Sequence, residues 1–472
     1  MTHIEKRDGG EGGAASGGSG GGDSKDSTKA TGWLPSRIWN DRNLAILYAN
    51  VALYALCYQM QTPMQLALVK SLVDGGSEEA RTQFAWVKSV NGVAQLGGSL
   101  VAGVLVDAVG VRNVMLLSFL ASFASYAMVA SATSVGMLYL AQAPTIFQHA
   151  VLAARAQVAL TLSDAERPQY LGYVGFAYGI GFVVGPALGG LLSTYSLTLS
   201  AALAAGLTLV SIALTLSTDD VRGGARTAPA AAPAAADGAS SSRARWSLDG
   251  YARVLRSPGL LFLLVVRCRS GACVRIVIFV FAHTRLPTPT PQLRLQLKSL
   301  FSFALAIFHA TFNLVADERF GLDAAGVGFL MSFVGAVGMI AQAVLVRAAT
   351  VRWSERTIGV VTAAALAACF GAYGLVHSTT ALYALMVPLV AFNTVFQVVN
   401  TAQIAREAPD DLKGTLVAVD MAIFSSMRIW TPAVGSMILT AAGHAAVAAT
   451  SSSACAGMLV LLLLFVHMGV CW

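Results

Sequence analysis

Charged side chains are scarce in this sequence. Asp, Glu, Lys and Arg together make up 12% of its 472 residues, while apolar residues make up 56%; soluble domains carry about 25% charged residues. Apolar runs of about twenty residues recur along the chain, and each is long enough to cross the ~30 Å hydrocarbon core of a bilayer. These runs are too long and continuous for the strands of a membrane β-barrel. The composition therefore predicts an all-α polytopic membrane protein.

Motifs of enzymes and of ATP-driven pumps are also missing. The sequence contains no GxxxxGK[ST], no HExxH and no GxSxG, so we expect neither ATP hydrolysis nor enzyme activity. Its six cysteines lie mostly in apolar segments and lack metal-ligand spacing, so we expect no metal and no cofactor. The net charge of +7 comes from Lys and Arg scattered over loops, so we expect no nucleic-acid partner.

The apolar runs fall into two sets separated by a polar linker. Residues 1–43 form a Gly- and Ser-rich tail that we expect to be disordered, without a cleaved secretory signal. Residues 44–216 hold six predicted spans, with the fourth at 137–160, and residues 217–257 form an Ala- and Pro-rich linker. Residues 258–467 hold about six more. Apart from the loop around residues 70–81, Lys and Arg lie on one side, which places both termini and the linker in the cytoplasm.

The second set of spans repeats the first. The matched positions, at offsets of 246 and 243, include Pro186 with Pro432, Gly189 with Gly435, and Gly92 with Gly335. One register holds over more than thirty residues, and both members of each pair run the same way through the membrane. This pattern predicts two six-helix bundles with pseudo-twofold symmetry about an axis along the membrane normal.

The seventh span breaks the repeat. The apolar segment near 259–283 contains Arg267, Arg269 and Arg275, which are costly inside a membrane. It begins 216 residues after the first span rather than about 246. We therefore predict an anomalous insertion at about 275–307, which is either a true insertion or a translated intron. A re-entrant or interfacial segment is the alternative.

A charged loop joins the second and third predicted spans. Gly103, Asp107, Gly110 and Arg112 fit the pattern GxxxDxxGxR, which resembles the signature loop of the major facilitator superfamily. The resemblance implies that Gly110 makes a tight turn. It also implies that Asp107 faces the N-terminus of the eleventh span and closes the cytoplasmic side, an interaction worth ~0.3–2 kcal/mol. An ordinary solvated loop with a glycine turn is the alternative.

The fifth predicted span carries a glycine-rich motif. Gly181, Gly185, Pro186, Gly189 and Gly190 fit the pattern GxxxGPxxGG, which resembles the antiporter motif of the drug–proton branch of this superfamily. Glycines at i, i+4 and i+8 leave one helix face without side chains, so a neighbouring helix can pack closely. Proline permits a bend. The motif predicts a face that slides or hinges, and generic membrane packing is the alternative.

Polar residues inside the spans are the candidates for a substrate or ion cavity. These candidates are Gln59, Gln61, Gln142, His149, Asn393, Gln397, Asn400, Asp420 and Arg428. The alternative for the amides is hydrogen bonding between helices, and for Asp420 and Arg428 it is a packing ion pair. His149 is a candidate proton carrier, with a structural histidine as the alternative. Lys88 is expected to snorkel to the external surface.

The family resemblance implies a function. Residues 326–342, GVGFLMSFVGAVGMIAQ, look like the organic-cation-transporter-like branch, of the solute carrier family 22 member 18 type. This implies a secondary transporter of small organic solutes, lipophilic organic cations or drugs, that works by alternating access with a proton as possible coupling ion. Gln142 stands where the drug–proton branch carries an arginine used in coupling. We expect a monomer in the lipid bilayer, of the plasma membrane or an intracellular one. A transport-inactive receptor or scaffold is the alternative.

Overall fold

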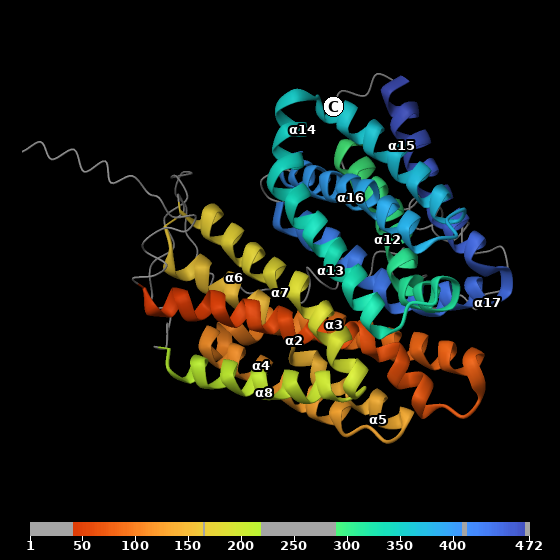
Figure 1. Ribbon diagram of the computed structural model, residues 1–472. Helices are drawn as coiled ribbons and strands as arrows, with labels where there is room; N and C mark the ends of the chain where they lie inside the picture. The colour runs from red at the N-terminus through yellow and green to blue at the C-terminus, as the bar shows by residue number, and fades with distance from the viewer. Residues whose placement is uncertain (1–40, 164–165, 219–288, 408–412, 468–472) are drawn as a thin grey trace, which may run out of the picture.

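The computed structural model describes residues 41–163, 166–218, 289–407 and 413–467, and these residues form helices joined by short turns (Figure 1). The helices form two bundles, as predicted. The predicted span near 259–283 and nearly all of the tail and linker lie outside the described residues.

The first bundle contains the six predicted spans, although the fourth is divided. Its helices are α2 (Arg42–Leu72), α3 (Gly76–Val109), α4 (Val111–Ala130), α5 (Val135–Leu140), η1 (Ala143–Phe147), α6 (Ala150–Thr161), α7 (Arg167–Tyr195) and α8 (Leu199–Leu216). The turn between α2 and α3 marks one side of the membrane protein, here named the loop-1 side. The turn between α3 and α4 marks the opposite side, named the loop-2 side.

The second bundle also supplies six spans. Its helices are α12 (Pro289–Phe320), α13 (Ala324–Ile340), the π-helical turn η2 (Ala341–Leu345), α14 (Val346–Arg352), α15 (Glu355–Tyr373), α16 (Thr379–Glu407) and α17 (Lys413–His467). The eighth span comprises α13, η2 and α14. The 55-residue α17 holds the last two spans, because the backbone leaves the helical region at Gly443, with φ 74° and ψ −177°.

Eight helices of the described chain are long and apolar enough to cross a membrane by themselves. Helices α2 and α3 are not among them, although they have 31 and 34 residues. In α2 the buried residues include Asn50, Gln59 and Gln61. Polar groups of this kind lower the hydropathy of a helix, and they are tolerated because they lie between helices rather than against lipid.

Helix α12 occupies the place of the seventh span. Its first residue, Pro289, follows Arg42, the first residue of α2, by 247 positions, which is close to the repeat offset of 246. Residues 289–307 of the predicted insertion therefore belong to a membrane helix. We infer that the extra residues precede Pro289, in the part of the chain that the structure does not describe.

The fourth span is broken, where one helix over 137–160 was predicted. Helix α5 ends at Leu140, a 3-10 turn follows with Pro144 near its start, and α6 begins only at Ala150. Proline removes one helical N–H, and the freed backbone groups need partners inside a membrane. The hydroxyl of Tyr54 in α2 donates to the Gln148 carbonyl over 2.9 Å, so a neighbouring helix supplies one such partner.

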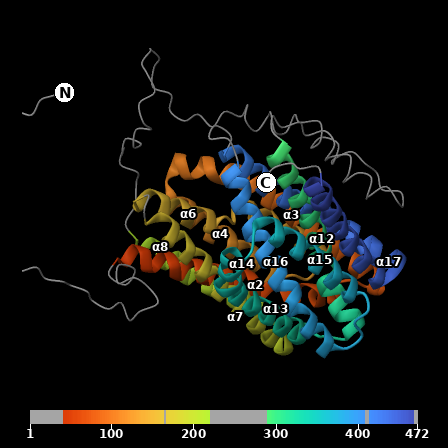
Figure 2. The ribbon, with the colours of Figure 1, turned by 90° about the horizontal axis from the view of Figure 1, so that it is seen from above.

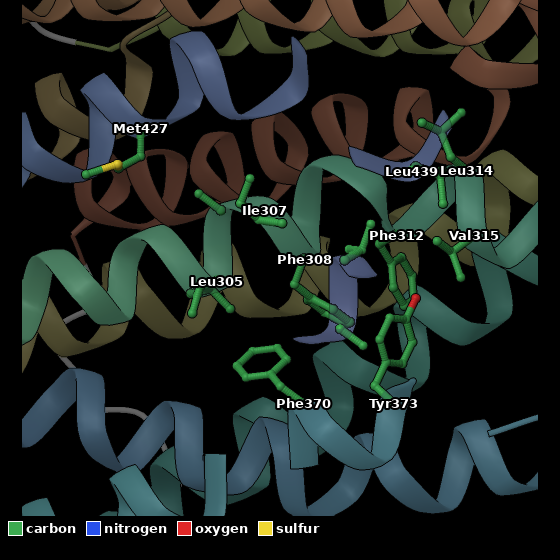
Figure 3. Close-up of a cluster of buried hydrophobic side chains, with 14 of the residues drawn as sticks. Leu305, Ile307, Phe308, Phe312, Leu314, Val315, Phe370, Tyr373, Met427 and Leu439 are labelled. Carbon is green, nitrogen blue, oxygen red and sulfur yellow. The ribbon is translucent and has the colours of Figure 1, made fainter. Parts of the chain in front are cut away.

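The core of the second bundle is built on α12. Figure 3 shows Phe308 beside Phe370 and Tyr373, and its ring centroid lies 5.6 Å and 5.2 Å from theirs. From Phe301 to Ala316 every residue of α12 is buried except His309, which is exposed, and its neighbour at 310, which is half-buried. Over residues 301–316, α12 is thus packed on almost all sides, and His309 is the one exposed position of that stretch.

The bundles meet through contacts that obey the repeat. A Cβ added at Gly335 in α13 would lie 2.7 Å from the Phe182 ring in α7. A Cβ added at Gly92 in α3 would lie 2.7 Å from the Arg428 carbonyl oxygen in α17. Gly92 pairs with Gly335 in the repeat, and Phe182 pairs with Arg428 at the offset of 246. The two contacts are therefore equivalent under the predicted pseudo-twofold symmetry.

The break at Gly443 generates a test of the backbone. Replacing Gly443 with Ala should lower the free energy of unfolding by about 1–3 kcal/mol, because its φ of 74° suits only glycine. The matched control is Gly457→Ala in the same helix, because nothing lies within 4 Å of an added Cβ at either position. Thermal unfolding of the purified protein in detergent measures both variants. Equal stability of the two variants would contradict this account.

Candidate functional site

One face of α7 lies directly against the backbone of α2. A Cβ added at Gly181 would lie 2.5 Å from the Leu56 nitrogen, and one added at Gly185 would lie 2.8 Å from the Leu56 carbonyl oxygen. At Gly189 the Met60 carbonyl oxygen would be only 2.1 Å away. Since real Cβ atoms do not approach other atoms this closely, only glycine permits the packing. The close approach expected of the glycine motif is therefore present.

The other face of α7 lies against α13 of the second bundle, and the two helices run side by side (Figure 2). A Cβ added at Gly328 would lie 2.3 Å from the Pro186 carbonyl oxygen, and one added at Gly190 would also meet the α13 backbone. The Ala187 N–H donates to the Ser332 hydroxyl over 2.9 Å. Helix α7 is thus held between α2 and α13, and it belongs to an interface inside one bundle and to another between bundles.

The turn on the loop-2 side depends on Gly110. Its backbone has φ 86° and ψ 159°, it donates to the Val106 carbonyl over 3.1 Å, and it lies between the end of α3 and the start of α4. An L-residue rarely adopts this conformation. The tight turn implied for this glycine is therefore present in the structure.

Of the other members of the signature loop, the structure describes the contacts of Arg112 but not those of Gly103 and Asp107. Arg112 donates over 2.7 Å to the Leu216 carbonyl at the C-terminal end of α8, where the helix dipole favours a cation. Arg112 thus ties the loop to its own bundle. Gly103 and Asp107 lie in α3, and the surroundings of both lie outside the described residues, so the predicted contact of Asp107 stays a prediction.

Polar contacts join the bundles on the loop-1 side. They are the ion pairs Lys70–Asp317 and Arg81–Glu318 and the hydrogen bond from Asn313 to the Thr62 carbonyl. The four charged side chains are each between 22% and 34% exposed, so solvent screens them only in part. The sequence interpretation noted the charge in the loop around residues 70–81 but missed its partners. The opposite charges at the end of the apolar run 300–316 were the available signal.

Three of the predicted cavity residues are engaged within the first bundle. Gln142 accepts from Asn91 over 3.0 Å and donates to the Leu138 carbonyl over 2.9 Å, which is the interhelical bonding given as the alternative. Gln59 accepts from the Thr62 hydroxyl over 3.3 Å. His149 packs against α3, where its Nε2 would lie 2.5 Å from a Cβ added at Gly98, and this buried Nε2 has no hydrogen-bond partner among the described residues.

Other predicted cavity residues have polar atoms without a hydrogen-bond partner among the described residues. Both amide atoms of Gln61 are buried in this way, and so are Asn393 Oδ1 and Asn400 Nδ2. Gln397 is half-buried. A buried polar atom without a partner costs about 1–3 kcal/mol, so these atoms are suited to bind water, an ion or a substrate.

Arg428 of α17 links the two bundles through α2. It is exposed, and its Nη2 donates over 3.3 Å to the Tyr58 hydroxyl of α2. The side chain of Asp420 lies outside the described residues, so the predicted pair stays untested. Lys88 is half-buried and lies one helical turn from Gly92, which packs against the Arg428 backbone, and its snorkelling to the external surface stays a prediction. His309 of α12 is exposed. His309 was missed because one histidine in an apolar run forms no pattern.

Comparisons with known proteins agree with this architecture. The family model described as Major Facilitator Superfamily matches residues 47–432. Human solute carrier family 67 member A1 is 26% identical over 370 residues, which cover 76% of this chain and 78% of the relative. Mouse solute carrier family 22 member 18 is 25% identical over 407 residues, which cover 85% and 90%. The crystal structure of the human organic anion transporter MFSD10 (TETRAN) has a TM-score of 0.61 at 18% identity, covering 89% of this chain and 99% of that chain.

The chain therefore belongs to the major facilitator superfamily. It is a multi-pass integral membrane protein with the facilitator fold, and it is a secondary transporter of a small molecule rather than an enzyme. Its fold class and family were both predicted from the sequence, and both are confirmed.

The glycine face of α7 generates a second test. Gly189→Ala should lower the free energy of unfolding by about 1–3 kcal/mol, because the new Cβ would collide with the Met60 carbonyl and force α2 and α7 apart. Gly206→Ala in α8 is the control, since nothing lies within 4 Å of an added Cβ there. Thermal unfolding of the purified protein reports both. If Gly189→Ala is as stable as the control, the close packing does not constrain α7.

Proposed function

We propose that this protein moves small organic solutes across the membrane by alternating access, and that its loop-2 side is cytoplasmic. The observation that carries the proposal is the set of polar contacts that joins the bundles on the loop-1 side. Lys and Arg on the loops support the orientation. In that orientation the described state is closed toward the outside and faces the cytoplasm.

The closure is seen in the polar contacts that cross between bundles. Among the described side chains, the polar contacts between bundles run from the Arg428–Tyr58 contact to the loop-1 end. Figure 1 shows the two bundles converging toward that end. On the loop-2 side, Arg112 bonds within its own bundle. The contacts that join the bundles toward the loop-1 end support one closed state of a rocking transporter.

The proposed cycle exchanges contacts on one side for contacts on the other. Opening the loop-1 side separates Lys70 from Asp317 and Arg81 from Glu318. Closing the loop-2 side brings Asp107 toward the N-terminus of α17, where a carboxylate is favoured by the helix dipole. Helix α7 moves with α2 and shifts along α13, because its glycine face keeps it in contact with both.

The substrate and the coupling ion are finer parts of the proposal. The resemblance to the organic-cation-transporter-like branch favours lipophilic organic cations, while the similar human structure is that of an organic anion transporter. A proton is the proposed coupling ion. Coupling through Gln142 and His149 has little support, since both side chains pack inside the first bundle.

Flux through the purified protein in proteoliposomes tests the transport function. We expect saturable uptake of at least one member of a panel of cationic, anionic and neutral organic compounds, and a dependence on a pH gradient if protons are coupled. Asp107→Asn should reduce the rate about tenfold or more if the carboxylate closes the loop-2 side. Binding of a panel compound without flux in any gradient would favour the receptor alternative.

The two ion pairs generate a separate prediction about the resting state. Lys70→Asp places two acidic groups together, so it should raise the population open on the loop-1 side by several-fold, as expected for a shift of about 1 kcal/mol. Labelling of Thr62→Cys with a membrane-impermeant maleimide measures that population. The double change Lys70→Asp with Asp317→Lys restores opposite charges and should return the labelling rate toward its starting value. Unchanged labelling in the single variant would show that these pairs do not hold the loop-1 side closed.

A further inference from the structure

Three basic side chains from three helices converge between the bundles. They are Arg428 of α17, Lys88 of α3 and His309 of α12. Lys88 lies one helical turn from Gly92, where an added Cβ would lie 2.7 Å from the Arg428 carbonyl oxygen, and the electrostatic influence of Arg428 on Lys88 and His309 agrees with this placement. Because Arg428 also donates to Tyr58 of the opposite bundle, the group faces the space between the bundles and not the lipid.

These groups are accessible although they lie well inside their helices. Arg428 is exposed and Lys88 is half-buried. His309 is the one exposed position of residues 301–316 in α12, a stretch that is otherwise packed against its neighbours. Accessible polar groups at this depth are a usual mark of a substrate or ion path in a membrane protein.

The charge of this cluster is not balanced among the described side chains. The described salt bridges are the two on the loop-1 side, and neither includes Arg428, Lys88 or His309. Among the described residues, the groups that interact with Arg428 include the phenols Tyr58, Tyr178 and Tyr54. Arg428 and Lys88 are cations that repel each other in a medium of low dielectric constant, so an anion between them would be stabilised by both, and the His309 ring can donate an N–H to it.

Packing alone does not account for an arginine at position 428. Its equivalent in the first bundle is Phe182, which makes the matching contact with Gly335. Lys88 likewise pairs with Met331 at the offset of 243. Apolar residues therefore occupy the equivalent positions at the α7–α13 contact between the bundles, and the presence of basic residues at the α3–α17 contact points to a ligand.

Aromatic rings surround the basic groups. Lys88 Nζ lies 5.4 Å from the centre of the Phe84 ring. Tyr54 and Tyr58 are stacked with ring centroids 6.3 Å apart. Such rings bind flat apolar bodies, while a guanidinium holds a carboxylate or sulfonate in a two-pronged hydrogen bond.

We propose that the substrate is an aromatic organic anion, whose acidic head binds Arg428, Lys88 and His309 and whose ring lies against the neighbouring tyrosines. This proposal rests on the proposed transport function and names its substrate class. It differs from the organic cations that the sequence resemblance implies, because a cation would be repelled by the described charges.

Two xanthene dyes of similar shape and opposite charge test the proposal. Fluorescein is an anion at neutral pH and pyronin Y is a cation. We expect fluorescein, but not pyronin Y, to raise the unfolding temperature of the purified full chain and to enter proteoliposomes. Arg428→Gln and Lys88→Gln should each weaken fluorescein binding about tenfold or more, as loss of a charged hydrogen bond does. Arg155→Gln, an exposed arginine on α6, is the control and should bind fluorescein like the native chain.

The outcomes separate the substrate class from the transport function. Preference for pyronin Y, no binding of fluorescein, or fluorescein binding unchanged in Arg428→Gln would each overturn the anion site, while flux of any panel compound would leave transport standing. Fluorescein binding that depends on Arg428 without any flux would support the site and refute transport.

Asp420 is the remaining charge to be tested, because it lies on α17 with Arg428. Asp420→Asn should change fluorescein affinity by no more than about twofold, the scale of a screened distant charge. A gain of about tenfold or more would show that Asp420 already neutralises Arg428, and would overturn the proposed site.

Discussion

The backbone contact of α7 with α2 on one face and α13 on the other is the constraint on which the rest of the structure depends. Apolar side chains gain little by leaving lipid for a helix interface, so membrane helices associate through close packing and polar contacts. Gly181, Gly185 and Gly189 allow α2 to approach, and Gly328 lets α13 meet the Pro186 carbonyl. Because one helix serves both interfaces, a rearrangement between the bundles is transmitted at once to the helix pair inside the first bundle.

The repeat accounts for the helix contacts between the bundles, and the positions that depart from the repeat carry the charged side chains. Gly92 and Gly335 occupy equivalent places and receive equivalent neighbours in the opposite bundle. At the neighbouring position, however, the second bundle carries Arg428 where the first carries Phe182. A rocking motion requires that the two halves pack alike, whereas a site for a charged ligand requires charge only where the ligand lies. The two requirements are compatible because a long side chain changes the charge without changing the backbone contact.

Sequence reasoning reached the features that have a periodic or compositional signal. The spans of the first bundle, the repeat, the turn at Gly110 and the glycine face of α7 are of this kind. Its predicted span near 259–283 lies outside the described residues, and it recognised α12 only as the apolar stretch 300–316, because the first turns of α12 are polar. It missed the Lys70–Asp317 pair because the partners are 247 residues apart, and only the folded chain brings them together. It missed the break in the fourth span although Pro144 was a local signal for it, because the backbone partner that Tyr54 supplies cannot be seen in the sequence.

The free energies of the two closures must be similar for the proposed cycle to work. Partly exposed ion pairs contribute about 0.2–1 kcal/mol each, and a carboxylate at a helix N-terminus contributes ~0.3–2 kcal/mol. Two pairs on the loop-1 side and one carboxylate on the loop-2 side therefore leave a difference that a bound substrate can reverse through its unequal affinity for the two states. If a large apolar interface closed either side, the free energy needed to open it would exceed the free energy that substrate binding supplies. The use of a few weak polar contacts, beside glycine faces that stay packed throughout, is what allows both states to be populated.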